Sequence, residues 1–140
     1  MARRREIVLD SSVVVKWFSK EEKSDEALKL MDLYTESSVE LSASELLFCE
    51  VANALRYKPD YDVKRFEEAV SQLFNLHMNV TPLTEELLGR AGDIAYDADI
   101  TLYDALPVAL AEHRKTVCMT ADEETQYRKL RPKGYPVELL

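Results

Sequence analysis

The chain has 140 residues, of which 46% are hydrophobic and 31% charged, with three Gly and five Pro. This length fits one domain with its own hydrophobic core, and the composition excludes a disordered or low-complexity chain, so we expect residues 1–140 to form a single domain. The net charge of -8 argues against a broad basic face that binds nucleic-acid phosphates, so any nucleic-acid role must rest on local cations or on bound metal.

Strands and helices alternate along the chain. Apolar runs, helical spacing and capping residues predict, in chain order, a strand at 6–10, helices at 12–18 and 24–36, a strand at 39–42, helices at 45–58 and from 60 or 62, a strand at 79–81, helices at 84–97 and 102–114, a strand at 116–120, a short helix from 122 and a strand at 136–139. Ser44 and Thr84 are the expected caps of two of these helices.

This alternation predicts a three-layer α/β/α sandwich around a central, mainly parallel, Rossmann-like sheet of four to five strands. In open sheets of this type the functional site lies beyond the carboxyl ends of the strands. We therefore look for chemistry in the residues that directly follow each predicted strand.

The sequence contains no signal for a membrane or for secretion. No apolar run reaches the roughly 18 residues that would span a bilayer, and the first residues lack the apolar stretch of a signal peptide. Cys49 and Cys118 lie in apolar segments, where we expect buried thiols rather than a disulfide. These features predict a cytoplasmic protein.

Two acidic residues lie within apolar helical segments. Glu50 follows Leu46 and Leu47 by four and three residues, which places it along the stripe that we expect to be buried. Asp104 belongs to the segment 102–111, which is apolar nearly all round and therefore predicts a central helix. A carboxylate in such surroundings is costly unless it is paired, protonated or bound to metal. Both acids therefore need a partner.

Asp10 and Asp122 each follow an apolar strand, and each could simply cap the next helix. Parallel strands end at the same edge of a sheet, so both would also face Glu50 and Asp104. Four carboxylates without His or Cys suit Mg²⁺ or Mn²⁺, as one ion or two. Such ions activate water and polarise a phosphodiester, which predicts a metal-dependent nuclease. A buried network of protonated acids or ion pairs is the alternative.

The residues around the four acids resemble the PIN-domain family, specifically VapC-type toxin ribonucleases. The matching segments are Ile7-Val8-Leu9-Asp10-Ser11-Ser12, Glu50-Val51-Ala52-Asn53-Ala54-Leu55, Leu102-Tyr103-Asp104-Ala105 with Ala109-Leu110-Ala111, and Thr120-Ala121-Asp122. Each motif is weak alone, but the four occur in order across nearly the whole chain. The resemblance implies a PIN-like sheet, Mg²⁺ or Mn²⁺, and cleavage of single-stranded RNA by a metal-activated water. It also implies a homodimer and a small antitoxin, and an acidic cleft would attract a basic inhibitory segment.

The resemblance also assigns individual roles. It implies that the catalytic and metal-binding acids are Asp10, Glu50, Asp104 and Asp122, and that Ser12, Asn53 and Thr120 are supporting polar groups near them. Apart from the resemblance, Asp99 is a candidate additional or outer-shell metal ligand and Glu123 a candidate outer-shell residue, although loop aspartates like Asp99 are mostly solvated and the helix dipole favours Glu123 without any function. Pro107 departs from the family, which often carries an aromatic residue there, and it could kink the helix that carries Asp104.

Three other interpretations compete with this one. The first is a catalytically inactive PIN-like module that binds protein or RNA through an exposed face of Phe66, Val70, Leu73 and Phe74. The second is a metal-free ribonuclease with His77 and His113 as acid and base. The third is a receiver or phosphatase fold, which also places an aspartate after its first strand, but dehalogenase-type phosphatases need a second aspartate where this chain has Ser12.

Overall fold

A five-stranded parallel sheet forms the centre of the computed structural model, which describes residues 4–140. The strands are β1 (Arg5–Leu9), β2 (Val39–Ser44), β3 (Asn79–Thr81), β4 (Val117–Thr120) and β5 (Val137–Leu139). The helices are α1 (Ser11–Phe18), α2 (Ser24–Thr35), α3 (Leu46–Arg56), α4 (Val63–Asn75), α5 (Glu85–Ala98), α6 (Leu102–His113) and α7 (Arg128–Leu130), with a π-helix at Glu123–Tyr127 and a 3-10 turn at Arg131–Lys133. The predicted α/β/α sandwich is confirmed.

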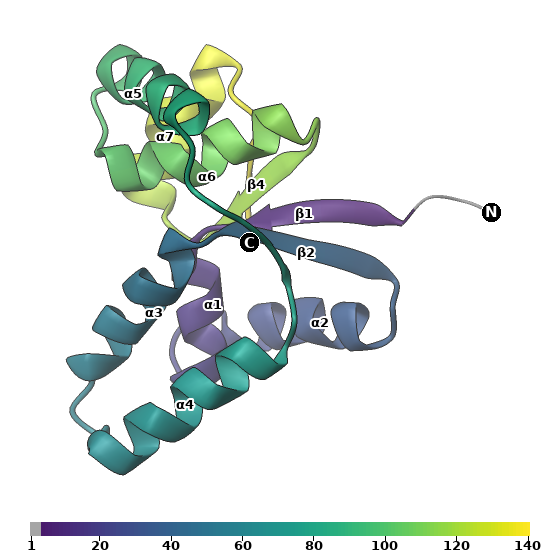
Figure 1. Cartoon of the computed structure of the whole chain (residues 1–140), viewed down its shortest axis with the longest axis vertical. Helices are drawn as coiled ribbons and strands as arrows, with labels where there is room; N and C mark the ends of the chain where they lie inside the picture. Colours follow the sequence, from purple (N-terminus) through teal and green to yellow (C-terminus); the bar gives the residue numbers. More distant parts are fainter. Residues whose placement is uncertain (1–3) are drawn as a thin grey trace.

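Helices cover both faces of the sheet. In Figure 1, α1 to α4 lie on one side of β1 and β2, whereas α5, α6 and α7 lie on the other. Strand alternation explains this division, because successive side chains of a strand point to opposite faces. Ile7 and Leu9 pack into the core beneath α1 to α4, while Val8 packs between the sheet and α6. All three side chains are almost completely buried.

The strand order, β3-β2-β1-β4-β5, creates a switch point between β1 and β4. From β1 the chain moves outward through β2 to β3, and it then returns to place β4 on the other side of β1. The backbone N–H of Asp10 donates to the carbonyl of Met119 at 3.0 Å, which ties the end of β1 to β4. Open α/β sheets form a crevice at such a point. Asp10 and Asp122 follow the two strands that border it.

Local sequence explains where most of the helices begin. Asp62 caps α4 by accepting from the N–H of Arg65 at 2.8 Å, and Thr84 caps α5 by accepting from the N–H of Leu87 at 3.1 Å. Ser44 does not cap α3 as predicted. It is buried in β2, where it pairs with Thr81 of β3, and α3 begins only at Leu46. The side chain of Ser44 suits a helix cap as well as a strand, and pairing with β3 places it in the strand.

Two predictions of burial need correction. Cys118 is buried, but Cys49 is exposed, because the buried line of α3 runs through Leu47, Val51 and Leu55 and leaves Cys49 outside it. The face of α4 is likewise not a free apolar surface. Leu73 is 2% exposed, and Phe74, although half-exposed, stacks on Phe48 of α3 with ring centroids 4.5 Å apart.

The middle of α6 is buried from Ala105 to Ala111, as its apolar sequence predicts. The helix continues through the buried Pro107 to His113. Within residues 4–140, no helix is both long and apolar enough to cross a membrane.

Candidate active site

Asp10 lies at the carboxyl end of β1 and is only 6% exposed. One carboxylate oxygen, Oδ2, accepts from the N–H of Ser12 at 3.0 Å, so Asp10 caps α1. The other, Oδ1, accepts from the side-chain amide of Gln126 at 3.4 Å. Burial raises the pKa of Asp10 above its ordinary value, and the negative charge of Asp122 adds to this effect. Asp10 therefore caps α1 as predicted, but this hydrogen bond does not cancel the free-energy cost of burying its negative charge.

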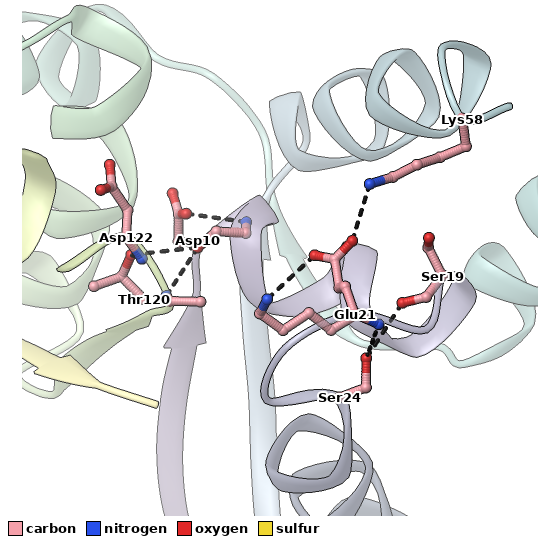
Figure 2. A network of polar contacts seen from close by, with 10 residues as sticks. Asp10, Ser19, Glu21, Ser24, Lys58, Thr120 and Asp122 are labelled. Carbon is pink, nitrogen blue, oxygen red and sulfur yellow. Dashed lines mark hydrogen bonds and ion pairs between the residues drawn. The ribbon is translucent and has the colours of Figure 1, made fainter. Parts of the chain in front are cut away.

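Asp122 stands beside Asp10 at the end of β4, where a small hydrogen-bond network holds the two segments together (Figure 2). The hydroxyl of the fully buried Thr120 accepts from the N–H of Asp122 at 3.0 Å and lies 3.3 Å from the Ser12 hydroxyl. The Ser12 hydroxyl in turn accepts from the N–H of Ala121 at 2.9 Å. Ser12 and Thr120 thus join the loop after β1 to the loop after β4.

The carboxylate of Asp122 also caps the π-helix that follows. Oδ1 accepts from the N–H of Thr125 at 3.0 Å, and Oδ2 accepts from the N–H of Gln126 at 3.4 Å. The N–H of Tyr127 reaches back to the carbonyl of Asp122 at 3.0 Å, the i to i+5 bond of a π-turn. Such turns are rare and occur often at functional sites. The predicted helix start at Asp122 is confirmed, with this unexpected first turn.

Gln126 is a buried member of the site that sequence inspection missed. Its side-chain amide donates to the backbone carbonyl of Asp104 at 2.9 Å and to Asp10, and its carbonyl oxygen accepts from the Thr120 hydroxyl at 2.7 Å. It therefore connects β1, β4 and α6 in the interior. A signal existed, because Gln126 lies midway between Asp122 and the buried Leu130 at spacings of four, on one face of a helix.

Asp104 and Glu50 approach this edge from α6 and α3. Asp104 lies in the first turn of α6, where its N–H donates to the hydroxyl of Thr101 at 3.1 Å. Burial raises the pKa of Asp104, and so do the charges of Asp10 and Asp122. Burial together with the charges of Asp10 and Asp104 raises the pKa of Glu50 from 4.5 to about 7. Glu50 is half-buried at the edge of the core rather than pointing into it, which corrects the predicted placement.

These contacts and charges define an acidic pocket at the switch point. Its lining includes Asp10, Ser11, Ser12, Lys16, Asp104 and Asp122. Glu50 does not itself line the pocket, but Ala54, one helical turn further along α3, does. Burial and the neighbouring carboxylates raise the pKa values of Asp10, Glu50 and Asp104, a perturbation that is common at functional sites. The segments that meet here are separated by up to about a hundred residues of sequence.

The donor set suits a hard divalent cation, because carboxylate oxygens are the ligands that Mg²⁺ and Mn²⁺ prefer. Among residues 4–140, however, no three His, Cys, Asp or Glu side chains are arranged to hold one ion together. The acids thus fit a metal in the chemistry of their donor atoms, and Asp10, Asp104 and Asp122 line one pocket.

The remaining predicted residues lie outside this pocket. Asn53 is exposed on α3. Asp99 ends α5 with a fully exposed side chain, 4.0 Å from the ammonium of Lys129. Glu123 is exposed in the first turn of the π-helix. His77 and His113 are both exposed, at the start of the β3 segment and at the end of α6.

Several solved structures share the fold of this chain. VapC20 of Mycobacterium tuberculosis, described as a sarcin-ricin loop cleaving toxin, has a TM-score of 0.70 at 14% identity, over 92% of this chain and 95% of that one. DNA-bound VapBC from Salmonella typhimurium has a TM-score of 0.68 at 16% identity, over 96% and 98%. VapBC2 from Rickettsia felis, bound to a promoter DNA fragment, has a TM-score of 0.69 at 11% identity, over 96% and 98%. At these identities the likeness shows the fold.

A search of curated protein sequences finds no match. The family model of the PIN domain, however, matches residues 7–130, a span that includes all four acids. With the switch-point geometry and the neighbouring folds, this match shows that the chain belongs to the PIN domain family.

Proposed function

We propose that this protein is a Mg²⁺- or Mn²⁺-dependent endoribonuclease that cleaves single-stranded RNA. The observation that carries the proposal is the mutual electrostatic strain of the acids at the switch point. Burial and neighbouring carboxylates raise the pKa values of Asp10, Glu50 and Asp104 together. A fold that only needed stability would be better served by neutral side chains at these positions. A divalent cation would offset the repulsion and make the cluster favourable.

The four acids would share the work unequally. Asp10 has both oxygens placed, by Ser12 and Gln126, and it is the most buried of the four donors. Asp104 and Glu50 would complete the principal site, and Asp122 would close it or help to bind a second ion. When bound, such ions supply an activated water and neutralise charge that develops on the phosphate. A hydrogen-bond network would hold the loops after β1 and β4 in fixed positions relative to each other. Its members are Ser12, Thr120 and Gln126.

The substrate and partners rest on the family resemblance. VapC20 is described as a sarcin-ricin loop cleaving toxin, and two of the similar structures are VapBC complexes. We infer that this chain is the toxin of a VapBC-type pair, acts as a homodimer and is inhibited by a small antitoxin. An acidic pocket favours an inhibitor with a basic segment, since an arginine could pair with Asp10 or Asp104.

A catalytically inactive PIN-like binding module is the second candidate. The retained acids disfavour it, and the burial of Leu73 removes much of the apolar face on which it depended. Calorimetry that detects no Mn²⁺ binding, together with stable capture of a partner, would favour this module over the nuclease.

Metal removal provides the test of the proposed function. The purified chain, free of any partner, should cleave single-stranded RNA when Mg²⁺ or Mn²⁺ is present. A chelator should abolish cleavage, and added Mn²⁺ should restore it, because the proposed nucleophile is a water that the metal activates. Gel analysis of a labelled RNA measures all three steps. Cleavage that continues in excess chelator would contradict the proposal.

A further inference from the structure

A second charged cluster borders the acidic pocket, and none of the proposed metal chemistry uses it. Glu21, in the turn between α1 and α2, accepts from the ammonium of Lys16 on α1 at 3.1 Å. It also accepts from the ammonium of Lys58, just beyond α3, at 2.9 Å. Figure 2 shows Lys58 reaching Glu21 across the gap between their backbone segments. We call these three residues the Lys16–Glu21–Lys58 bridge.

The turn around Glu21 is held firmly by its own hydrogen bonds. The N–H of Glu21 donates to the Ser24 hydroxyl at 2.9 Å, and that hydroxyl donates to the carbonyl of Ser19 at 3.3 Å (Figure 2). The two ammonium groups lower the pKa of Glu21 although burial opposes them, so its carboxylate stays charged. Glu21 therefore offers a fixed anion around which two flexible lysine side chains are ordered.

Two of the three bridge residues belong to the same pocket wall as the acids, and Lys58 contacts that wall through Glu21. Lys16 and Glu21 line the pocket together with Asp10, Asp104 and Asp122. Among the described residues of that lining, Lys16 is the one with a positive charge. Its side chain is only 12% exposed, and that of Lys58 is 30% exposed. The pairing with Glu21 makes this degree of burial possible for the two lysines.

Charge counting indicates what the bridge can bind. Two ammonium groups and one carboxylate leave a net positive charge beside four acids, in a chain whose overall charge is -8. Each ammonium has three N–H donors and gives one to Glu21, so both retain donors for an anion. Lysine is a common phosphate ligand in proteins. An RNA strand that reaches the acids carries further phosphates on either side of the reacting one, and Lys16 lines the same pocket.

We propose that the Lys16–Glu21–Lys58 bridge binds a backbone phosphate of single-stranded RNA adjacent to the phosphate that is cleaved. This inference rests on the proposed nuclease function, and it assigns Lys16 and Lys58 to substrate binding, with Glu21 as the residue that positions them. The competing explanation is that the bridge only fastens the α1–α2 turn to the end of α3. That structural role predicts altered stability without altered RNA recognition.

Lys58→Met and Lys16→Met separate these explanations in steady-state cleavage of a short single-stranded RNA with Mn²⁺. Each substitution should raise KM about five- to tenfold with little change in kcat, because a charged hydrogen bond to substrate is lost while the acids remain. The dependence of log KM on log salt should also become shallower by about 0.7, the value for one phosphate contact on a single strand. Lys58→Arg should recover most of the affinity.

Lys133→Met is the matched control, since Lys133 forms an exposed ion pair with Asp97 at 3.6 Å and neither residue lines the pocket, whereas Glu21, the partner of Lys58, does. Its KM and salt dependence should equal those of the parent. If the parent cleaves RNA but Lys58→Met and Lys16→Met retain its KM and salt dependence, the phosphate site is wrong and the nuclease stands. If the parent neither cleaves nor binds RNA, the nuclease proposal falls and takes this inference with it.

Discussion

Asp10→Asn is expected to lower kcat for RNA cleavage by about a thousandfold, the upper range for losing one electrostatic contact to a transition state. Asparagine has nearly the same shape and can still accept from the N–H of Ser12, so the cap of α1 should survive. The charge is lost, and with it the acceptor for the side-chain amide of Gln126, because the asparagine NH2 group takes that position. Asp10 is the most buried of the four acids, and its charge acts where water screens it least.

A cleavage time course with Mn²⁺ measures this effect, and circular dichroism checks that the variant is folded. Asp99→Asn is the matched control, because Asp99 is a fully exposed acid outside the pocket. It should keep the activity of the parent. Parent-like cleavage by a folded Asp10→Asn variant would remove Asp10 from the catalytic site.

Glu50→Gln is expected to stabilise the metal-free protein while it removes most of the activity. Burial and the charges of Asp10 and Asp104 disfavour the Glu50 carboxylate and raise its pKa from 4.5 to about 7. Above that pH the metal-free fold carries an unfavourable charge that glutamine lacks. Because Glu50 is partly exposed, solvent screening reduces the gain to about 1–2 kcal/mol.

The pH dependence of stability follows from the sign of this pKa shift. Between the unfolded pKa of 4.5 and the folded pKa of about 7, the native state binds the Glu50 proton more tightly than the unfolded state does. The associated stability is therefore complete below pH 4.5 and is lost as the pH rises through about 7. The free energy of unfolding of metal-free Glu50→Gln should lack this decline.

Urea denaturation with chelator, on both sides of neutral pH, measures the difference between parent and variant. RNA cleavage by the parent should instead increase as the pH rises through about 7, because the carboxylate that a metal needs forms over that range. Glu124→Gln, at an exposed acid paired with Arg128, should change neither quantity. A Glu50→Gln variant less stable than the parent above neutral pH would show that Glu50 has a favourable partner in the fold.

The fold could be predicted from the sequence to a large extent because its strands and helices carry strong local signals. The run from Ile7 to Leu9 and the apolar segment of α6 can be buried in few other ways. The ends of helices and strands were less predictable where a residue suits two structural roles. Ser44 suits a helix cap as well as a strand, and pairing with Thr81 decides between them. Cys49 has apolar neighbours in sequence, but only the helical phase of α3 shows that it faces outward.

The site could be predicted in outline but not in its supporting contacts. Parallel topology indicates that Asp10 and Asp122 share one edge, and the apolar surroundings of Asp104 set it apart from the other acids. Gln126 and Glu21 gave much weaker signals, since a glutamine or a glutamate in a polar stretch is usually solvated. Their importance depends on tertiary contacts with Thr120, Asp104 and two lysines.

Titration calorimetry with Mn²⁺ tests the central claim most directly, because the claim concerns what these acids bind. A carboxylic acid with a raised pKa releases its proton when a metal ion binds in the place of that proton. Binding to the parent should therefore release protons about one unit below the Glu50 pKa of about 7 and fewer about one unit above it. Proton release is read from the dependence of the heat on buffer ionisation enthalpy. The heat of Mn²⁺ binding should disappear in Asp10→Asn. Equal Mn²⁺ binding by parent and variant would contradict a metal site at these carboxylates, and so would the absence of Mn²⁺ binding by the parent at both pH values.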